Sequence, residues 1–215
     1  MTYENRHVAQ HYFTTDPEVA SRPAPVRVSL RGLELQLQSD RGVFAYAHLD
    51  RGTEILLRTV PDPPDGELLD LGCGYGPIAI TIALLAPSAR VWALDVNRRA
   101  LELTARNATA VGAANVTAVP PDAVPDDVAF SAIYSNPPVR LGKAQLQALL
   151  RYWLSRLQPE GVAYLVVQRH LGADTLAAWL AAEGFGVLRV RSRQGYRVLE
   201  VRHGATSDHH GDRDS

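Results

Sequence analysis

Lysine, cysteine and long apolar runs are all scarce in this sequence. Lys143 is the only lysine among 22 basic residues. Genome composition explains this bias most simply, although arginine also suits contacts with phosphates and bases. The single cysteine, Cys73, excludes a disulfide framework or a cysteine-based zinc site within the chain. No apolar run approaches the ~20 residues that span a bilayer, and the first 20 residues carry no signal-peptide core. We therefore expect a cytoplasmic protein without a membrane segment or a metal.

The bulk composition is that of one large globular domain. The chain has 215 residues, of which 46% are hydrophobic and 21% charged, and its formal net charge is −1. This hydrophobic content is enough for a proper core, and the charge balance argues against a disordered chain or a polycation. A neutral total still allows a local basic face that binds nucleic acid.

The first 60 residues have the character of an accessory segment. Prolines interrupt residues 1 to 25, which we expect to be irregular. Apolar and polar residues then alternate in 26–30 and 33–37 around Arg31-Gly32, which predicts a β-hairpin. A helix over 49–60 leads into a proline-rich linker at 61–64. We therefore set an accessory segment at 1–60.

After the linker the pattern changes to alternating strands and helices. Strands are expected at 67–71, 90–94, 116–119, 128–134, 162–167, 187–190 and 196–201. Helices are expected at 77–85, 97–111, 143–157 and 174–182. Repeated βα units predict an α/β fold, a doubly wound and mostly parallel seven-stranded sheet with an N-terminal β-hairpin extension. The catalytic domain would span 61–203, and the polar residues 204–215 would form a disordered tail.

A glycine-rich turn follows the first strand of this domain. Asp70 ends the strand, and Gly72, Gly74 and Gly76 lead into the next helix. Ligands of doubly wound sheets bind at the carboxyl ends of strands, where glycines allow close approach and a helix start offers free N–H groups. Asp95 ends the second strand and can accept hydrogen bonds from ribose hydroxyls. The pattern predicts an adenosine-containing cofactor, while a plain tight turn with helix-start acids is the structural alternative.

Two features favour S-adenosyl-L-methionine over a nicotinamide dinucleotide. The glycine spacing is Gly-x-Gly-x-Gly, whereas the dinucleotide fingerprint places its third glycine one residue later. Asp70 at the start of the turn would repel a pyrophosphate and attract a sulfonium or amino group. Asp122, followed by Ala123, can accept from the adenine amine, although it is equally a turn residue among prolines. Cys73 is interpreted as a small buried filler.

The fourth strand ends at Asn136-Pro137-Pro138, which we predict to be the catalytic turn. Two prolines fix two φ angles and remove two N–H donors. The Asn136 side-chain oxygen and the Pro137 carbonyl then remain as acceptors for the two hydrogens of a planar amino group. Catalysis would consist of positioning and electrostatics, with no covalent intermediate. An ordinary Asn-Pro turn is the structural alternative.

Together these motifs resemble a known family. The segments 70–76, 95–97 and 135–138 look like the motifs of class I S-adenosylmethionine-dependent methyltransferases that modify amino groups. Segments 11–13, 42–44, 49–53 and 136–143 are similar to the small-subunit ribosomal RNA guanine-N2 methyltransferase family in its short, single-domain form. The similarity covers roughly 7–202. The resemblance implies that the partner is ribosomal RNA or the small ribosomal subunit. It also implies that Phe44 lies against the cofactor and that Asp95, Val96 and Asn97, at the end of a strand, bind the cofactor.

One residue departs from the family pattern. Many amino methyltransferases carry an aromatic residue after Asn-Pro-Pro to stack on the target base, and here that position is Val139. Tyr12, Phe13 and Phe44 are the candidates for stacking, each with core packing or anchoring as the alternative role.

Basic residues near the same sheet edge are candidates for RNA contacts. A base amine must be unpaired or flipped out to react, and the mouth of the cleft then meets phosphates. We assign this role to Arg140, Lys143, Arg169 and His170. Arg189, Arg191 and Arg193 alternate along a late strand and should share one face, as a solvated stripe or a further RNA contact.

Three alternatives stay open at this point. A protein glutamine or DNA adenine amino methyltransferase has the same fold and uses Asn-Pro-Pro equally well. A nicotinamide-dependent oxidoreductase is disfavoured by the glycine spacing and by Asp70. A non-catalytic RNA-binding module would keep the cofactor pocket without transferring a methyl group. The target nucleotide and the oligomeric state do not follow from the sequence.

Overall fold

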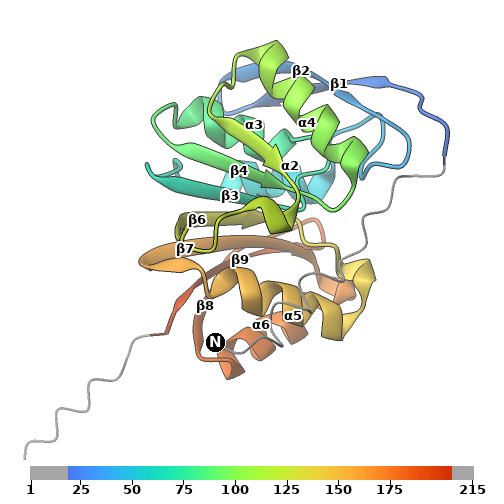
Figure 1. Ribbon diagram of the computed structural model, residues 1–215. Helices are drawn as coiled ribbons and strands as arrows, with labels where there is room; N and C mark the ends of the chain where they lie inside the picture. The colour runs from blue at the N-terminus through green and yellow to red at the C-terminus, as the bar shows by residue number, and fades with distance from the viewer. Residues whose placement is uncertain (1–18, 205–215) are drawn as a thin grey trace, which may run out of the picture.

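The computed structural model describes residues 19–204, which form a seven-stranded sheet with helices on both faces (Figure 1). The strands run in the order β5-β4-β3-β6-β7-β9-β8. Their bounds are β3 Glu67–Leu71, β4 Arg90–Leu94, β5 Val116–Val119, β6 Phe130–Ser135, β7 Leu157–Gln168, β8 Phe185–Arg193 and β9 Tyr196–His203. The first five strands in this order are parallel, and β9 is antiparallel to both of its neighbours. The predicted fold class is confirmed.

The helices divide between the two faces of the sheet. One face carries α2 Arg51–Thr59, α3 Pro77–Leu85 and α4 Arg98–Val111, and the other carries α5 Lys143–Leu154 and α6 Ala173–Ala182 (Figure 1). Three short 3-10 turns, η1 Pro121–Ala123, η2 Val139–Leu141 and η3 Arg169–Leu171, follow β5, β6 and β7. No helix within 19–204 is long and apolar enough to cross a membrane.

The N-terminal hairpin is present as predicted. Strands β1 Ala24–Leu30 and β2 Leu33–Ser39 pair antiparallel, and both Arg31 and Gly32 have positive φ, which suits the tight turn between twisted strands. The hairpin is tied to α4, where the Asn107 side chain donates to the Gln38 carbonyl and accepts from its N–H, both at 2.8 Å. This extension therefore shares the hydrophobic core of the sheet.

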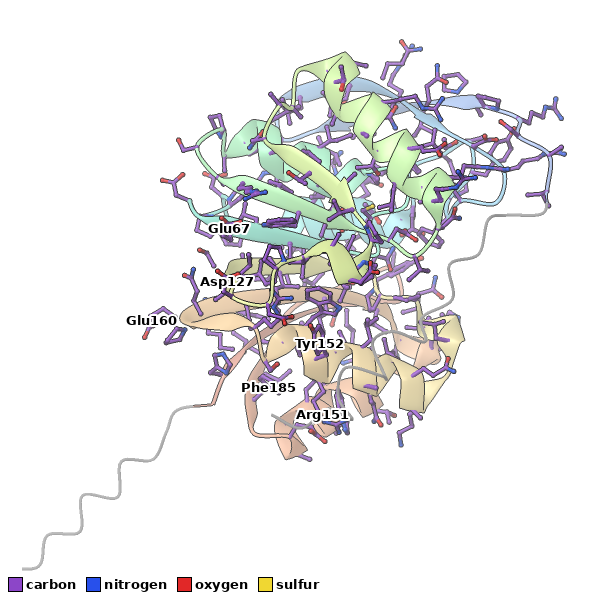
Figure 2. The ribbon with its side chains drawn as sticks, viewed as in Figure 1. Glu67, Asp127, Arg151, Tyr152, Glu160 and Phe185 are labelled. Carbon is purple, nitrogen blue, oxygen red and sulfur yellow. The ribbon has the colours of Figure 1, made fainter. Side chains whose placement is uncertain are left out.

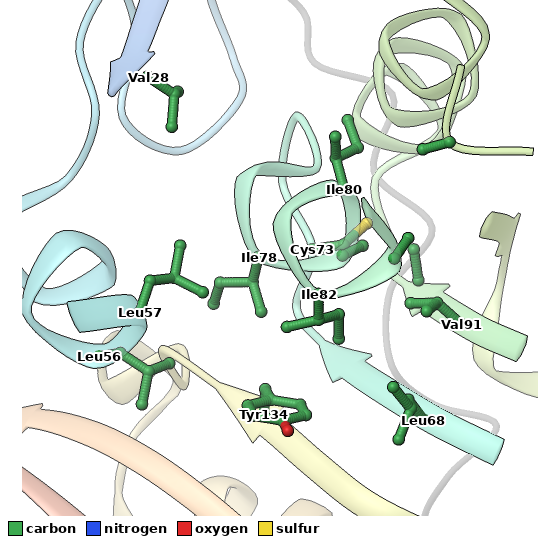
Figure 3. Close-up of a cluster of buried hydrophobic side chains, with 14 of the residues drawn as sticks. Val28, Leu56, Leu57, Leu68, Cys73, Ile78, Ile80, Ile82, Val91 and Tyr134 are labelled. Atoms are coloured by element: carbon green, nitrogen blue, oxygen red, sulfur yellow. The ribbon is translucent and has the colours of Figure 1, made fainter. Parts of the chain in front are cut away.

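Helix α2 is anchored by the same core (Figure 3). Leu56 and Leu57 of α2 are fully buried, beside Ile78 of α3 and Tyr134 of β6. Burying such a leucine contributes about 1.5–3 kcal/mol. This packing fixes the start of α2 next to the end of β6.

Several predicted boundaries differ from the structure, mostly by one to five residues, and two of the differences have a clear physical reason. The helix expected over 143–157 ends at Leu154, and Leu157 begins β7. Leu157 is buried and its apolar spacing fits either element, so periodicity alone could not separate them. The strand expected from residue 128 begins at Phe130, because the Val128 N–H is used in a turn to the Pro125 carbonyl.

A bulge also breaks the predicted arginine stripe on β8. Arg189 pairs with Leu199 but Arg191 pairs with Val198, so one extra residue lies between them. An extra residue moves the following side chains to the opposite face. Arg189 therefore forms an ion pair with Asp174 of α6, whereas Arg191 and Arg193 line a hollow against α2.

Several acids lie along the sheet edge where the parallel strands begin. Figure 2 labels Glu67, Asp127 and Glu160 at this edge. The glycine turn and Asn-Pro-Pro follow the carboxyl ends of β3 and β6, so the candidate site lies at the opposite edge.

Candidate active site

The candidate site lies where the strand order reverses. Strand β3 has β4 on one side and β6 on the other, which is the position where doubly wound sheets bind their ligands. Gly72 follows β3 and Asn136 follows β6. The Ser135 hydroxyl donates to the Leu71 carbonyl at 2.7 Å and joins the two strand ends. The two predicted motifs are therefore neighbours.

The N–H groups of the glycine loop are used inside the protein. Those of Gly72 and Cys73 donate to the Leu94 carbonyl, that of Gly76 to the Cys73 carbonyl, and that of Gly74 to Asp95. Gly76 has φ 92°, and a Cβ there would lie 2.9 Å from Thr104 Cγ2, so only glycine fits. The loop therefore has one fixed shape set by its own hydrogen bonds.

This arrangement differs from a pyrophosphate site. The helix start was expected to offer free N–H groups, but Pro77 has none and the Ala79 N–H donates to Asp70 at 2.9 Å. A pyrophosphate site needs several loop and helix N–H groups aimed at the anion. The loop geometry therefore argues against a dinucleotide.

Asp70 lies beneath the loop and does not line the candidate cavity. Its side chain is fully buried, and among the described residues its Oδ1 has no hydrogen-bond partner. Burial raises the pKa of Asp70 from 3.8 to about 8. The hydrogen bond from Ala79 lowers this pKa, and the nearby Asp95 raises it slightly. A neutral, protonated Asp70 is consistent with this dry position.

Asp95 and Asn97 shape the other side of the loop. Asp95 accepts from the Gly74 N–H through Oδ2 and from the Asn97 N–H through Oδ1, each at 2.9 Å. Burial raises the pKa of Asp95, while these bonds and one from Val96 lower it. Each carboxylate oxygen has a second lone pair for a hydroxyl donor. Asn97 caps α4 and donates to the Gly42 carbonyl, which holds the segment before Phe44 against the loop.

An open hollow, called the cavity below, lies between the glycine loop and the Asn136-Pro137-Pro138 turn. Its walls combine loop backbone with apolar and polar side chains, and it is lined by Phe44, Ala45, Asp50, Thr53, Gly72, Cys73, Gly74, Tyr75, Pro77, Ile78 and Asn136. Phe44 is 61% exposed at its rim. Cys73 is buried beside Thr104, and burial holds its pKa well above the ordinary value, so it is a filler and no nucleophile.

The Asn136-Pro137-Pro138 turn presents hydrogen-bond acceptors, and one of them already accepts a hydrogen bond within the protein. Asn136 lines the cavity, and no described residue donates to its Oδ1. The Pro137 carbonyl, which was expected to be free, accepts from the Val139 N–H at 2.8 Å across Pro138, whose φ and ψ are −74° and 73°. This is an inverse γ-turn, and it leaves the carbonyl one lone pair for a ligand.

Helix α2 contributes two side chains that the sequence did not assign. The Asn136 Nδ2 donates to Asp50 Oδ2 at 2.7 Å and to Thr53 Oγ1 at 3.1 Å. Asp50 also caps α2 by accepting from the Thr53 N–H. An N-cap aspartate in the segment 49–53 was the available signal, but no local pattern could show that it meets a residue 86 positions away.

The remaining predicted residues lie at the same edge, outside the cavity. Asp122 and Ala123 are exposed on η1 after β5, and Lys143, Arg169 and His170 are exposed after β6 and β7. Val139 is partly buried and packs against the core, so its side chain contributes to packing. Tyr12 and Phe13 lie outside the described residues, as does the tail from 205, and the Arg140 side chain is not described. No cluster of metal-ligating side chains occurs in the part of the chain that the structure describes.

A group of arginines lies near the start of α2. Arg51, Arg58, Arg191 and Arg193 line one hollow around Glu54. Arg51 and Arg58 form ion pairs with Glu54, whose pKa they lower against burial, which raises it. The α2 arginine group thus holds four positive charges against one negative charge.

The fold is that of a class I methyltransferase. The family model for the methyltransferase small domain matches residues 34–200. The chain is 31% identical to the uncharacterized protein YbxB of Bacillus subtilis over 199 residues, which cover 91% of this chain and 99% of that one. The chain therefore belongs to the methyltransferase small domain family.

Two further relatives are named for their activities. Ribosomal RNA small subunit methyltransferase C of Hahella chejuensis is 37% identical over 142 residues, which cover 64% of this chain and 41% of that protein. The structure of the T. thermophilus 16S rRNA N2 G1207 methyltransferase (RsmC) in complex with AdoMet and guanosine matches with a TM-score of 0.73 at 25% identity, covering 87% of this chain and 52% of that one. This chain spans about half of these longer relatives. The resemblance seen in the sequence, including S-adenosylmethionine as the family's cofactor, is confirmed.

Proposed function

We propose that this protein transfers a methyl group from S-adenosyl-L-methionine to the N2 amine of a guanine in small-subunit ribosomal RNA. The observation that carries the proposal is the amide of Asn136. Its nitrogen is tied to Asp50 and Thr53, so its oxygen is the atom left for a ligand in the cavity. That arrangement suits a donor such as an amino group.

The chemistry of the residues in and around the cavity suits the proposed cofactor. Gly72 and Gly74 bring loop backbone to the wall of the cavity, where a Cβ would reach van der Waals contact with Pro138 or Val43, and Phe44 and Ile78 supply apolar walls. Asp95 has lone pairs for ribose hydroxyls, and Asp122 remains the candidate for the adenine amine. When bound, the cofactor supplies an electrophilic methyl group on a sulfonium.

Asn136 and Pro137 would perform the chemistry by orientation. The Asn136 Oδ1 and the Pro137 carbonyl each accept one hydrogen of the target amine, which directs its lone pair at the methyl carbon. The N–C bond forms as the C–S bond breaks with its electron pair on sulfur, and the amine nitrogen then releases one proton to water. Pro138 keeps the turn rigid.

The surroundings of the cavity support an RNA substrate. The ring of Phe44, exposed at the cavity rim, would stack on a flipped base, a contact that contributes about 1–3 kcal/mol. Lys143, Arg169 and His170 would meet the backbone beyond the turn, with Tyr12, Phe13 and Arg140 as further candidates. The α2 arginine group extends the basic surface on the other side of Asp50.

Labelling of ribosomal RNA tests this function against its closest alternatives. RNA from a strain lacking the protein is incubated, free or in small subunits, with tritiated S-adenosylmethionine, and its nucleosides are separated. We expect label in N2-methylguanosine alone. Label in N6-methyladenosine or in protein glutamine would replace guanine as the substrate, and binding of the cofactor without any transfer would favour the non-catalytic module.

A further inference from the structure

Asp50 does more than cap the N-terminus of α2. Its Oδ2 accepts from the Thr53 N–H at 2.9 Å and from Asn136 Nδ2 at 2.7 Å. Its Oδ1 has no hydrogen-bond partner among residues 19–204, although Asp50 lines the cavity beside Asn136. Capping and tying Asn136 occupy one oxygen, so the other is available to a ligand.

The two bonds to Asn136 Nδ2 fix which way its amide faces. An amide nitrogen has two hydrogens, and Asp50 Oδ2 and Thr53 Oγ1 take both. The acceptor Oδ1 of Asn136 and the acceptor Oδ1 of Asp50 therefore stand on adjacent residues of one cavity. Thr53 is only 2% exposed, although it also contributes to the wall of this cavity.

The groups around Asp50 leave its carboxylate available as a hydrogen-bond acceptor. The pKa of the Tyr75 phenol lies above its ordinary value, mainly because of burial and to a smaller extent because the Asp50 carboxylate is near. The Tyr75 hydroxyl donates to the His48 carbonyl and does not neutralise Asp50. In the described part of the chain, the only cation on the same helix turn, Arg51, is turned to Glu54 and Gln194.

We infer that Asp50 reads the N1–H of the target guanine while Asn136 and Pro137 hold its N2 amine. This inference rests on the proposed function and specifies the base at that site. Guanine presents N1–H and N2–H₂ side by side, which matches adjacent acceptors. Adenine presents a lone pair at N1 beside its amine, and a carboxylate repels that lone pair. A site whose polar group is left unpaired rejects the wrong partner strongly.

The substitution Asp50→Asn turns this selectivity around without removing the cap. Asparagine is an equally good N-cap, and its oxygen can still face Thr53 and Asn136. Its amide nitrogen then points a donor at the position of N1. The matched probe is 2-aminopurine riboside, which keeps the 2-amino group of guanosine but has an unprotonated N1.

The experiment compares binding of guanosine and 2-aminopurine riboside to the protein saturated with S-adenosylhomocysteine, by ligand-observed NMR. We expect the wild type to prefer guanosine about 10- to 100-fold, as for hydrogen bonds to charged groups. Asp50→Asn should lower this ratio at least tenfold or reverse it. Thr53→Val, which loosens Asn136 without touching N1, should weaken both ligands and leave the ratio within about twofold.

Each outcome decides the inference. An unchanged ratio in a folded Asp50→Asn, with its melting temperature near that of the wild type, would reduce Asp50 to a cap. A wild type that binds neither nucleoside, or both equally, would also overturn it. Failure of the proposed function is recognised separately, because it appears as the absence of N2-methylguanosine in the labelled ribosomal RNA. Should Asp50→Asn not fold, Asp50→Ser keeps a capping oxygen but lacks the outward acceptor, and it should also lose the preference.

Discussion

The glycine loop and the catalytic turn face one cavity but use their polar groups in opposite ways. In the loop, hydrogen bonds within the protein use the N–H groups of Gly72, Cys73, Gly74 and Gly76. At the turn, Asn136 Oδ1 and Asp50 Oδ1 have no protein donor within the described residues, and the Pro137 carbonyl keeps one lone pair. The loop is thus built for shape, and the turn is built to accept hydrogens from a ligand.

This difference separates binding from chemistry in the site. Substitutions around the loop should change how well the cofactor binds or how stable the fold is. Substitutions at the turn should change methyl transfer while the cofactor still binds.

The largest effect is expected at the turn. Asn136→Ala removes the oriented acceptor, and we expect single-turnover methyl transfer to fall at least ~100-fold, as when one preorganised hydrogen-bonding group is lost. Calorimetry should show cofactor affinity within about threefold of the wild type. Full activity in this variant would remove the role of Asn136, and an equal loss of affinity would erase the contrast with the loop.

The next effect is expected at the loop. Asp95→Ala should weaken cofactor binding by ~1–3 kcal/mol, because charge-assisted bonds to ribose hydroxyls are lost. Transfer at saturating cofactor should stay close to that of the wild type. Asp122→Ala is the companion variant, and it should cost less because Asp122 is exposed, whereas Asp95 is partly buried and held by the Gly74 and Asn97 N–H groups. Unchanged affinity in Asp95→Ala would contradict the ribose assignment.

The next prediction concerns how Asp70 changes the pH dependence of the free energy of unfolding. Its pKa is about 8 in the folded protein and 3.8 ordinarily, so unfolding releases a proton between about pH 4 and 8. The free energy of unfolding should therefore fall as pH rises through this window, by at most ~1.4 kcal/mol per pH unit.

Asp70→Asn keeps an acceptor for the Ala79 N–H and cannot ionise, so its unfolding free energy should depend less on pH between 5 and 8. Denaturant titrations at several pH values measure the difference, with exposed Asp65→Asn as the control. Parallel curves for wild type and Asp70→Asn would show that Asp70 is ionised in the fold.

The smallest effect concerns the α2 arginine group. Replacing Arg191 and Arg193 by serine should reduce the salt dependence of RNA binding by about 1.5 in log–log slope, close to one phosphate contact each. Arg189→Ser is the matched control, because the bulge places Arg189 on the opposite face of β8. Equal slopes for the pair and the control would exclude this surface from RNA binding.

Much of the fold followed from local patterns. The strands 67–71, 90–94 and 116–119 were predicted to the residue, since each is a short apolar run between clear turn signals. The glycine turn and Asn-Pro-Pro were found because their residue types fix backbone geometry locally. Where two elements shared one apolar pattern, as at Leu157, the boundary was lost.

The part of the site that escaped prediction depends on tertiary contacts. Asp50 meets Asn136 only because α2 packs its leucines against β6 and α3. The bulge after Arg189 moves two arginines to a new face, and alternation in the sequence carries no sign of it. Burial of Asp70 under the loop likewise depends on the folded sheet, so its distance from the cavity could not be inferred from its position in the motif.

A crystal structure with S-adenosylhomocysteine and guanosine tests the central claim most directly. We predict the N2 nitrogen within about 3.2 Å of both Asn136 Oδ1 and the Pro137 carbonyl oxygen, on the side facing the cofactor sulfur. A guanine whose amine contacts neither oxygen, with the sulfur bound away from this turn, would contradict the account.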